Sequence, residues 1–556
     1  MMKKTKLASL ALALAGTALA SEGTADAVRR APVLPDISCF QTPEQGGGGG
    51  ASEVQRPPVL IEGLGTSGIV PDTQSAEARR WFDQGVALVW AFDEVEAVRA
   101  FRQAQALDPN CAMCFWGEAW ARSPTINLNP RTEELALATA AAERAVSLSR
   151  RLPDAEKRLV RAMRQRMGRT EFNAARYARA LAKLAERHPA HDAINVEAAN
   201  AGMLAADRFS EGSLPQRLLE RVMARSPEHS GAIHMYIHLT DWIDRQDLAE
   251  RHAERLGRIA PAASHLVHMP SHTFYGVGRY ADAAAVNVRA IAADAAYVAR
   301  VAPPESSYRT GLLAHNMHFA MNSALMRGDG ETALSVAEQF KARYLGAGAG
   351  TRYRTIGSAV WYSEGLHGDP RAVLAISEPE ESNVIFRAMR HYARGEALAR
   401  QGNAAAVRAE AEALKGLREG ALAPQLGRGG GALAEIAQHV LEGRAAMLAG
   451  NYEAAQAAYR NAMDRQTAAR FGSDPPLWWY STRRSLAASL LAAGNHADAR
   501  EQLVASLEHW PNDPLALYAL AKAEEGLGNR DAAAAALTRA RAGWSGDVSK
   551  VPLARI

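Results

Sequence analysis

The sequence predicts an all-α protein built as a solenoid of stacked helical hairpins. From about residue 75 onward the chain is rich in alanine and has no strong alternation of β-branched residues, which favours helices over strands. Small residues, glycine and proline recur in phase along this part of the chain. Two histidine pairs, His234/His238 and His268/His272, are also 34 residues apart. A fixed period of this length is typical of an array in which each hairpin packs on the next one.

The first hairpin shows the spacing most clearly. With Ala78 as position 1, Gly85 falls at position 8, Ala97 at 20, Ala104 at 27 and Pro109 at 32. These are landmarks of the tetratricopeptide repeat (TPR), in which small residues let two helices approach and the proline starts the next turn. The chain resembles the TPR superfamily over roughly residues 75 to 545. The resemblance implies a right-handed superhelix with a concave groove lined by the first helix of each hairpin.

Further units divide the rest of the chain. Ser230, Ser264 and Ala314 each begin a hairpin, and later landmarks recur through the C-terminal part. We therefore expect an N-terminal array over residues 75–345 and a C-terminal array over 346–556. The glycine runs at 346–350 and 427–431 are expected to break the array as longer loops. The aromatic run at 478–480 is expected to pack between C-terminal repeats.

The N-terminus is typical of an export signal. Lys3, Lys4 and Lys6 precede an apolar stretch from Leu7 to Ala20, which is too short for an ordinary membrane span and ends in a small-x-small cleavage pattern. Residues 1–20 are therefore predicted to be a signal peptide, and the mature protein is expected to be periplasmic or secreted. Residues 21–74 are expected to be a flexible segment containing the glycine run 46–50.

The central histidines share one face of the predicted array. Positions 2, 5, 9, 12 and 13 of the first helix face the groove, because the other positions are committed to packing. Six histidines fall at positions 2, 5 or 9 of three successive hairpins: His234, His238, His268, His272, His315 and His318. Three more residues lie in register with them, namely His265 at position 2, Asn322 at position 9 and Asp241 at position 12.

These histidines predict a transition-metal site. Imidazoles spaced by three or four residues on one helix can bind a single ion, and side chains from neighbouring helices can converge on it. Several imidazoles with few carboxylates suit copper or zinc better than calcium or magnesium. Copper is the first choice, with zinc and iron as alternatives. The six could form two trihistidine centres or one centre with spare rings, and Asp241 could be a ligand or orient a ring.

Cys111 and Cys114 open the second hairpin. Their Cys-x-x-Cys spacing allows a structural disulfide, a redox dithiol or a metal clamp, and the disulfide is preferred. Trp116 and Trp120, at positions 5 and 9 of the same hairpin, are expected to line the groove and help bind an apolar ligand or peptide; tight packing between helices is the alternative. Pro270, between His268 and His272, predicts a kink or a late helix start.

The same segments resemble a group of large exported bacterial TPR proteins. The matching motifs are the Cys-x-x-Cys at Cys111, the His-x-x-x-His at His234, the His-Met-Pro-Ser-His at His268 and the His-Asn-x-His at His315. This resemblance supports the site more than any one activity.

Two functions remain open from the sequence. The first is a metalloprotein whose candidate activity is that of an oxidoreductase acting on a small or aromatic substrate. The second is a scaffold that holds a peptide or protein partner in its groove without catalysis. The net charge of +4 over 556 residues, with no long basic run, argues against nucleic-acid binding.

Overall fold

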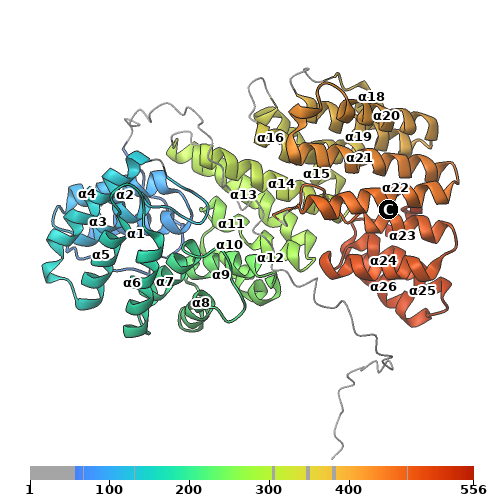
Figure 1. Cartoon of the computed structure of the whole chain (residues 1–556). Helices are drawn as coiled ribbons and strands as arrows, with labels where there is room; N and C mark the ends of the chain where they lie inside the picture. Colours follow the sequence, from blue (N-terminus) through green and yellow to red (C-terminus); the bar gives the residue numbers. More distant parts are fainter. Residues whose placement is uncertain are drawn as a thin grey trace, which may run out of the picture.

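The computed structural model describes residues 57–66, 68–130, 132–303, 307–345, 351–378, 383–471 and 474–556. These residues form a succession of packed helices and contain no β-strand (Figure 1). The predicted all-α, TPR-type solenoid is confirmed. The predicted signal peptide, the glycine run 46–50, Cys39 and the glycine run 346–350 lie outside the described residues.

The helices follow one another from one end of the molecule to the other (Figure 1). The α-helices are α1 (Ala76–Trp90), α2 (Glu94–Leu107), α3 (Ala112–Ala121), α4 (Thr132–Leu148), α5 (Asp154–Arg166), α6 (Ala174–Arg187), α7 (Asp192–Leu204), α8 (Leu214–Arg225), α9 (Ser230–Trp242), α10 (Glu250–Ile259), α11 (Ser264–His268), α12 (Pro270–Gly276), α13 (Tyr280–Val301), α14 (Ser307–Met326), α15 (Gly330–Tyr344), α16 (Thr351–Ile356), α17 (Ser358–His367), α18 (Pro370–Ala375), α19 (Val384–Arg400), α20 (Ala404–Glu419), α21 (Gly427–Leu448), α22 (Tyr452–Ala469), α23 (Arg483–Ala492), α24 (His496–His509), α25 (Pro514–Gly526) and α26 (Arg530–Gly543). Short 3-10 helices occur at η1 (Ser149–Arg151), η2 (Gln246–Ala249), η3 (Ala423–Leu426), η4 (Val548–Lys550) and η5 (Leu553–Arg555).

The turns within the hairpins show why the glycines recur. Gly450 lies between α21 and α22 with φ +72°, a left-handed conformation that glycine adopts without steric cost. The next residue, Asn451, accepts a hydrogen bond from the backbone of Ala454 and so caps α22.

Small residues also set how closely the helices approach. A Cβ added at Gly85 would lie 2.7 Å from the ring of Phe101, and one added at Gly117 would lie 2.3 Å from the same ring. Phe101 is fully buried on α2, between α1 and α3. One large side chain therefore fills the space that two glycines leave open, which is the packing that the repeat landmarks predict.

One predicted loop is wrong. Residues 427–431 do not interrupt the array, because they form the first turn and a half of α21. Of these glycines Gly430 is required by close packing, since a Cβ there would lie 2.4 Å from Cδ1 of Ile385 on α19.

The segment between α22 and α23 reaches back across the molecule. We call residues 474–480 the strap. Asn322 of α14 donates a hydrogen bond to the carbonyl of Pro476 at 2.9 Å, Tyr362 of α17 to that of Leu477 at 3.0 Å, and Tyr275 of α12 to that of Trp479 at 3.4 Å. Trp478 does pack on C-terminal helices through Tyr362 and Tyr392, as expected. The strap as a whole, however, also joins the C-terminal array to the histidine-bearing helices.

The end of the predicted flexible segment packs on the N-terminal array. Gln84 of α1 accepts a hydrogen bond from the backbone of Ile61 and donates one to the carbonyl of Val59. Asp72 accepts hydrogen bonds from the backbone nitrogens of Ala112 and Met113, at the start of α3. This segment therefore fastens the first hairpins.

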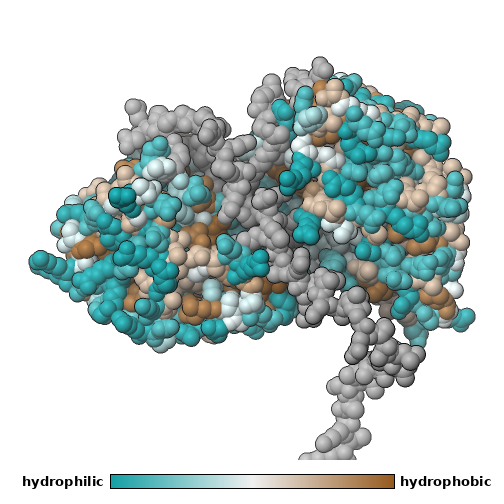
Figure 2. All heavy atoms as spheres, in the orientation of Figure 1, coloured by the Kyte–Doolittle hydropathy of each residue, from teal (hydrophilic) through white to brown (hydrophobic). Residues whose placement is uncertain are grey.

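The face of the molecule drawn in Figure 2 is largely polar. Figure 2 shows hydrophilic side chains over most of the visible face, with apolar residues in scattered small patches. Among the described helices, none combines the length and hydrophobicity needed to cross a bilayer.

Candidate metal centre

The predicted histidines meet inside the array and form two trihistidine groups. Group one consists of His234, His238 and His265, and group two of His268, His272 and His315. In each group one ring nitrogen of every member lies within 4.8 Å of the others. All six rings are buried, and none of these residues exceeds 8% exposure. They come from α9, α11, α12 and α14, the middle helices in Figure 1.

Both groups are built by the same repeat rule. Each takes the histidines at positions 5 and 9 of one hairpin, namely His234/His238 and His268/His272. The third ring comes from position 2 of the following hairpin, which is His265 in group one and His315 in group two. His265 is therefore a full member of the site and not only a residue beside it. The rings therefore gather as two groups of three, with His265 in the place that the sequence analysis gave to His318.

His318 belongs to neither group. It occupies position 5 of its hairpin, but position 9 is Asn322, whose Nδ2 lies 3.3 Å from the Nε2 of His318. Asn322 also holds the strap through its bond to Pro476. His318 thus stands where a third group would begin, but position 9 of its hairpin is Asn322 and not a histidine. Its predicted role as a ligand is not supported by this placement.

Pro270 divides the central helix. Helix α11 ends at His268 and α12 begins at Pro270, with Met269 between them in helical conformation. Proline is tolerated at a first helical position because its missing N–H would have no partner there. The predicted kink therefore lies between the two histidines, whose Nε2 atoms still come within 3.0 Å of each other.

The nitrogens of group one converge on His234. Its Nε2 lies 3.1 Å from Nε2 of His238 and 3.0 Å from Nε2 of His265. Two imidazoles bound to one tetrahedral ion by bonds of about 2.0 Å have nitrogens about 3.3 Å apart. The observed separations are close to that distance.

The first hairpin holds and covers group one. The Nδ1 of His234 lies 2.6 Å from the carbonyl oxygen of Trp90, so Nδ1 carries the hydrogen and Nε2 presents its lone pair. The ring of Phe92, in the turn between α1 and α2, lies 4.6 to 5.9 Å from the rings of His234, His238 and His265. Phe92 has a φ of +57°, which is unfavourable for an aromatic residue, and this conformation places its ring against all three histidines.

Group two brings two lone pairs face to face. The Nδ1 of His268 lies 2.7 Å from the side-chain oxygen of Asn287, and Nδ1 of His272 lies 3.2 Å from Asp474 and 3.5 Å from Asp241. These oxygens only accept, so both Nδ1 atoms carry hydrogen, and both Nε2 atoms are lone-pair donors in the neutral rings. The two Nε2 atoms nevertheless lie 3.0 Å apart. That contact is repulsive unless a cation, either a proton or a metal ion, lies between them.

The charge of the rings suits metal binding. Burial lowers the pKa of His234 to about 3, and lowers the pKa values of His238, His265 and His268 well below the ordinary value. These imidazoles are therefore neutral at neutral pH and bind a cation without first losing a proton. For His272, burial opposes protonation, but Asp474 and Asp241 outweigh it and raise the pKa.

The two groups adjoin. The ring centroids of His238 and His272 are 6.0 Å apart, and those of His265 and His268 are 5.9 Å apart. Phe319 of α14 covers group two as Phe92 covers group one, with its ring 4.8 to 5.2 Å from those of His268, His272 and His315. Ions held by the two groups would therefore be neighbours, each beside a phenylalanine ring.

The remaining predicted site residues lie away from the groups. The sulfur atoms of Cys111 and Cys114 form a disulfide at the start of α3, which is the preferred alternative of the sequence analysis. Trp116 and Trp120 are buried and stacked on each other, and Trp120 also packs on Trp90. They do not line an open groove, because neighbouring side chains cover them. The packing alternative therefore describes both residues.

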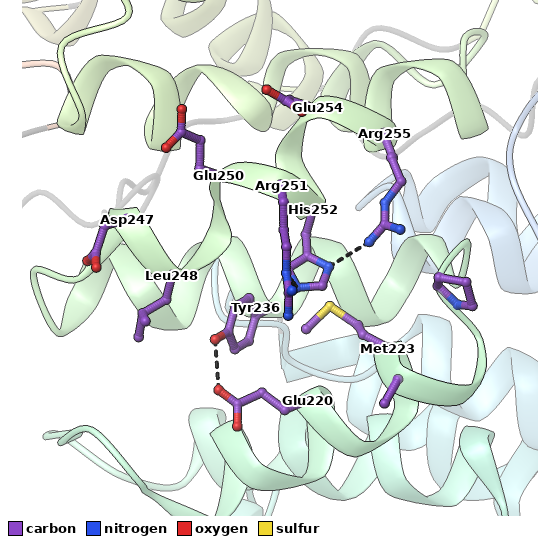
Figure 3. A pocket seen from close by; sticks show the side chains of 12 residues that line it. Glu220, Met223, Tyr236, Asp247, Leu248, Glu250, Arg251, His252, Glu254 and Arg255 are labelled. Atoms are coloured by element: carbon purple, nitrogen blue, oxygen red, sulfur yellow. Dashed lines mark hydrogen bonds between the residues drawn. The ribbon is translucent and has the colours of Figure 1, made fainter. Parts of the chain in front are cut away.

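A separate hollow of about 830 Å³ lies on the opposite face of α9, bordered by α8 and α10 (Figure 3). Tyr236 donates a hydrogen bond to Glu220 on one wall, and Arg255 contacts the ring of His252 on the other. Burial, together with Arg251 and Arg255, lowers the pKa of His252 to about 4. This histidine therefore takes no part in the two groups.

Comparison with known proteins shows only distant similarity. No protein-family model and no curated protein sequence matches this chain. A structure of Naa15/Naa10 bound to HypK-THB is 15% identical, covers 86% of this chain and 90% of that chain, and has a TM-score of 0.22. The human IFIT1 dimer with m7Gppp-AAAA is 12% identical, covers 85% and 91%, and has a TM-score of 0.27. Scores this low carry no argument about function.

Proposed function

We propose that this protein is a metalloprotein that holds a pair of copper ions, one in each trihistidine group, and that it acts as an oxidoreductase. The observation that carries the proposal is the contact between His268 and His272. Two buried Nε2 lone pairs 3.0 Å apart need a cation between them, and the neighbouring group also brings three imidazoles together, with Nε2 atoms 3.0 and 3.1 Å apart.

The surroundings support a metal ion more than a proton. A single proton between His268 and His272 would satisfy that pair alone. It would not account for a third imidazole in each group, nor for Nδ1 bonds that turn His234 and His268 toward their group. Metal-ligating histidines characteristically donate their other N–H to a carbonyl or carboxylate, as these rings do.

Copper fits the donor set best. Imidazole nitrogen is a good ligand for copper, zinc, iron and nickel, and for a given site copper(II) binds most tightly in the first-row series. A copper pair held by the two groups would supply two-electron redox chemistry, in which dioxygen would take up two electrons and two protons to give hydrogen peroxide and a substrate would supply both. The buried histidine rings, covered by Phe92 and Phe319, would limit the access of water to the ions.

The scaffold alternative has less support. A groove that binds an extended peptide must be open along its concave face. Beside the histidines, the strap occupies that side of α12 and α14, and its backbone carbonyls are already hydrogen-bonded to Tyr275 and Asn322. A partner would have to displace this segment first.

Metal analysis of the full-length protein tests the proposal. We expect about two equivalents of copper per chain after reconstitution under reducing conditions. His238→Ala and His272→Ala should each lose one equivalent, and the double variant should lose both. His509→Ala, at the exposed end of α24, is the matched control and should keep both.

Two results would overturn the proposal. One is less than about a tenth of an equivalent of any transition metal before and after reconstitution, which would leave a protonated His272 as the cation of group two. The other is zinc bound so firmly that copper cannot replace it, which would remove the redox chemistry.

After oxidation, two coupled cupric ions should give an electron paramagnetic resonance signal well below that expected for the total copper.

A further inference from the structure

The two groups differ in the charge around them. In the described part of the chain, no carboxylate lies within ion-pair distance of a group-one ring. In group two, Asp474 lies 3.2 Å from Nδ1 of His272 and 3.4 Å from Nε2 of His315, and Asp241 lies 3.5 Å from Nδ1 of His272. Both carboxylate side chains are about 15% exposed, so water screens them only in part.

This difference decides which ion each group favours. A divalent ion entering a buried site loses more hydration energy than a monovalent ion does, and neutral imidazoles restore only part of it. Two nearby carboxylates attract a dication twice as strongly as a monocation. Group two therefore favours a divalent ion relative to group one.

We propose that group two is the tighter site for a divalent cation and that Asp474 sets this preference, whereas group one, which has only imidazoles, favours monovalent copper. The inference rests on the proposed function and makes its two sites unequal. Asp474 is a positioning residue here: it fixes the orientation of His272 and His315 and supplies negative charge. Metal would accordingly load in a defined order.

The strap gives the C-terminal array a part in the site. Asp474 is its first residue, and the carbonyls of Pro476, Leu477 and Trp479 are hydrogen-bonded to Asn322, Tyr362 and Tyr275. Of the two groups, only group two receives a residue from this distant part of the sequence.

Zinc titration of the full-length, metal-free protein tests the inference, because zinc is divalent and has no redox chemistry. We expect a first equivalent at least tenfold tighter than the second. Asp474→Asn should weaken the first equivalent by roughly 10- to 100-fold and leave the second unchanged. His238→Ala should instead remove the second. The control is Asp498→Asn on the exposed surface of α24, which should match the parent protein.

A second substitution guards against misfolding of the strap. Asp241→Asn, on α9, should weaken the same equivalent without touching residues 474–480. Equal affinities for the two zinc ions, or an unchanged first equivalent in both Asn variants, would overturn the inference and leave the proposed function standing. No uptake of zinc or copper by the parent protein would overturn both.

Discussion

The orientation of His268 yields the sharpest prediction about the candidate site. Its Nδ1 donates to the side-chain oxygen of Asn287 at 2.7 Å, and both residues are fully buried. Asn287→Leu removes the acceptor at similar volume. If the ring of His268 keeps the orientation that points Nε2 at the metal, its Nδ1–H then has no strong acceptor. A buried donor without a partner costs about 1 to 3 kcal/mol of free energy.

We expect this change to weaken metal binding to group two by about 10- to 100-fold, or about 1.4 to 2.7 kcal/mol. The lower end is favoured, because the hydroxyl of Ser271 lies 3.3 Å from the same Nδ1 and can replace part of the bond. In group one, the acceptor for His234 is the backbone carbonyl of Trp90, which this substitution does not change.

The assay is competition with a chromophoric chelator in a His238→Ala background, so that only group two is measured. Asn287→Asp keeps an acceptor at the same atom and adds a negative charge beside group two, so it should bind at least as tightly as its parent. If Asn287→Leu binds as tightly as its parent, the ring is held by something other than this bond, and the argument for an oriented ligand fails.

Three further predictions concern stability. Burial raises the pKa of Glu94 from 4.5 to about 8, so the stability that protonated Glu94 contributes is complete below pH 4.5 and is lost as the pH rises through 8. In urea unfolding, the free energy of unfolding of Glu94→Gln relative to the parent should therefore rise by roughly 4 kcal/mol over that interval, and a constant difference would refute the prediction. Gly443→Ala would place a Cβ 2.4 Å from the ring of buried Tyr459 and should lower the free energy of unfolding by about 1 to 3 kcal/mol. Gly416→Ala, which meets open space on α20, should raise it by up to about 1 kcal/mol, and equal effects of the two substitutions would contradict this packing account. Trp478→Ala empties a fully buried site in the strap and should cost about 3 to 5 kcal/mol by thermal or urea unfolding, and a loss below about 1 kcal/mol would show that the strap is not firmly packed.

The repeat period predicted the ligands because it sets which residues share a face. Counting positions from Ser264 was enough to place His268 and His272 in the groove, and the same count put His265 there at position 2. The count alone does not show that a histidine at position 2 of one hairpin joins the histidines at positions 5 and 9 of the preceding hairpin. That relation depends on how far one hairpin is rotated against the next, so the count alone gives His318 the same standing as His315, whereas of these two only His315 joins a group among the described residues.

The residues missed by sequence analysis come from outside the repeated pattern. Trp90 ends α1 and Phe92 lies in the turn that follows it, and the role of Phe92 depends on a left-handed backbone that its residue type does not favour. Asp474 reaches group two through a chain reversal between α22 and α23, more than a hundred residues along the sequence from its histidine partners. The only local signal was a Pro-Pro-aromatic run that fits no hairpin position, and such a run does not say what it will contact.

The regular and irregular parts of the chain therefore contribute different things to the site. Stacked hairpins place the same ligand positions beside one another, so a pair of similar histidine groups follows from the repeat itself. Repetition alone would make the groups equal. Their differences come in part from two segments: the end of α1 with the turn after it gives group one a carbonyl and an apolar cover, and the strap, which does not repeat, gives group two a second carboxylate beside that of Asp241 on α9. A substitution in either segment should change one group only, whereas a change in hairpin packing should disturb both.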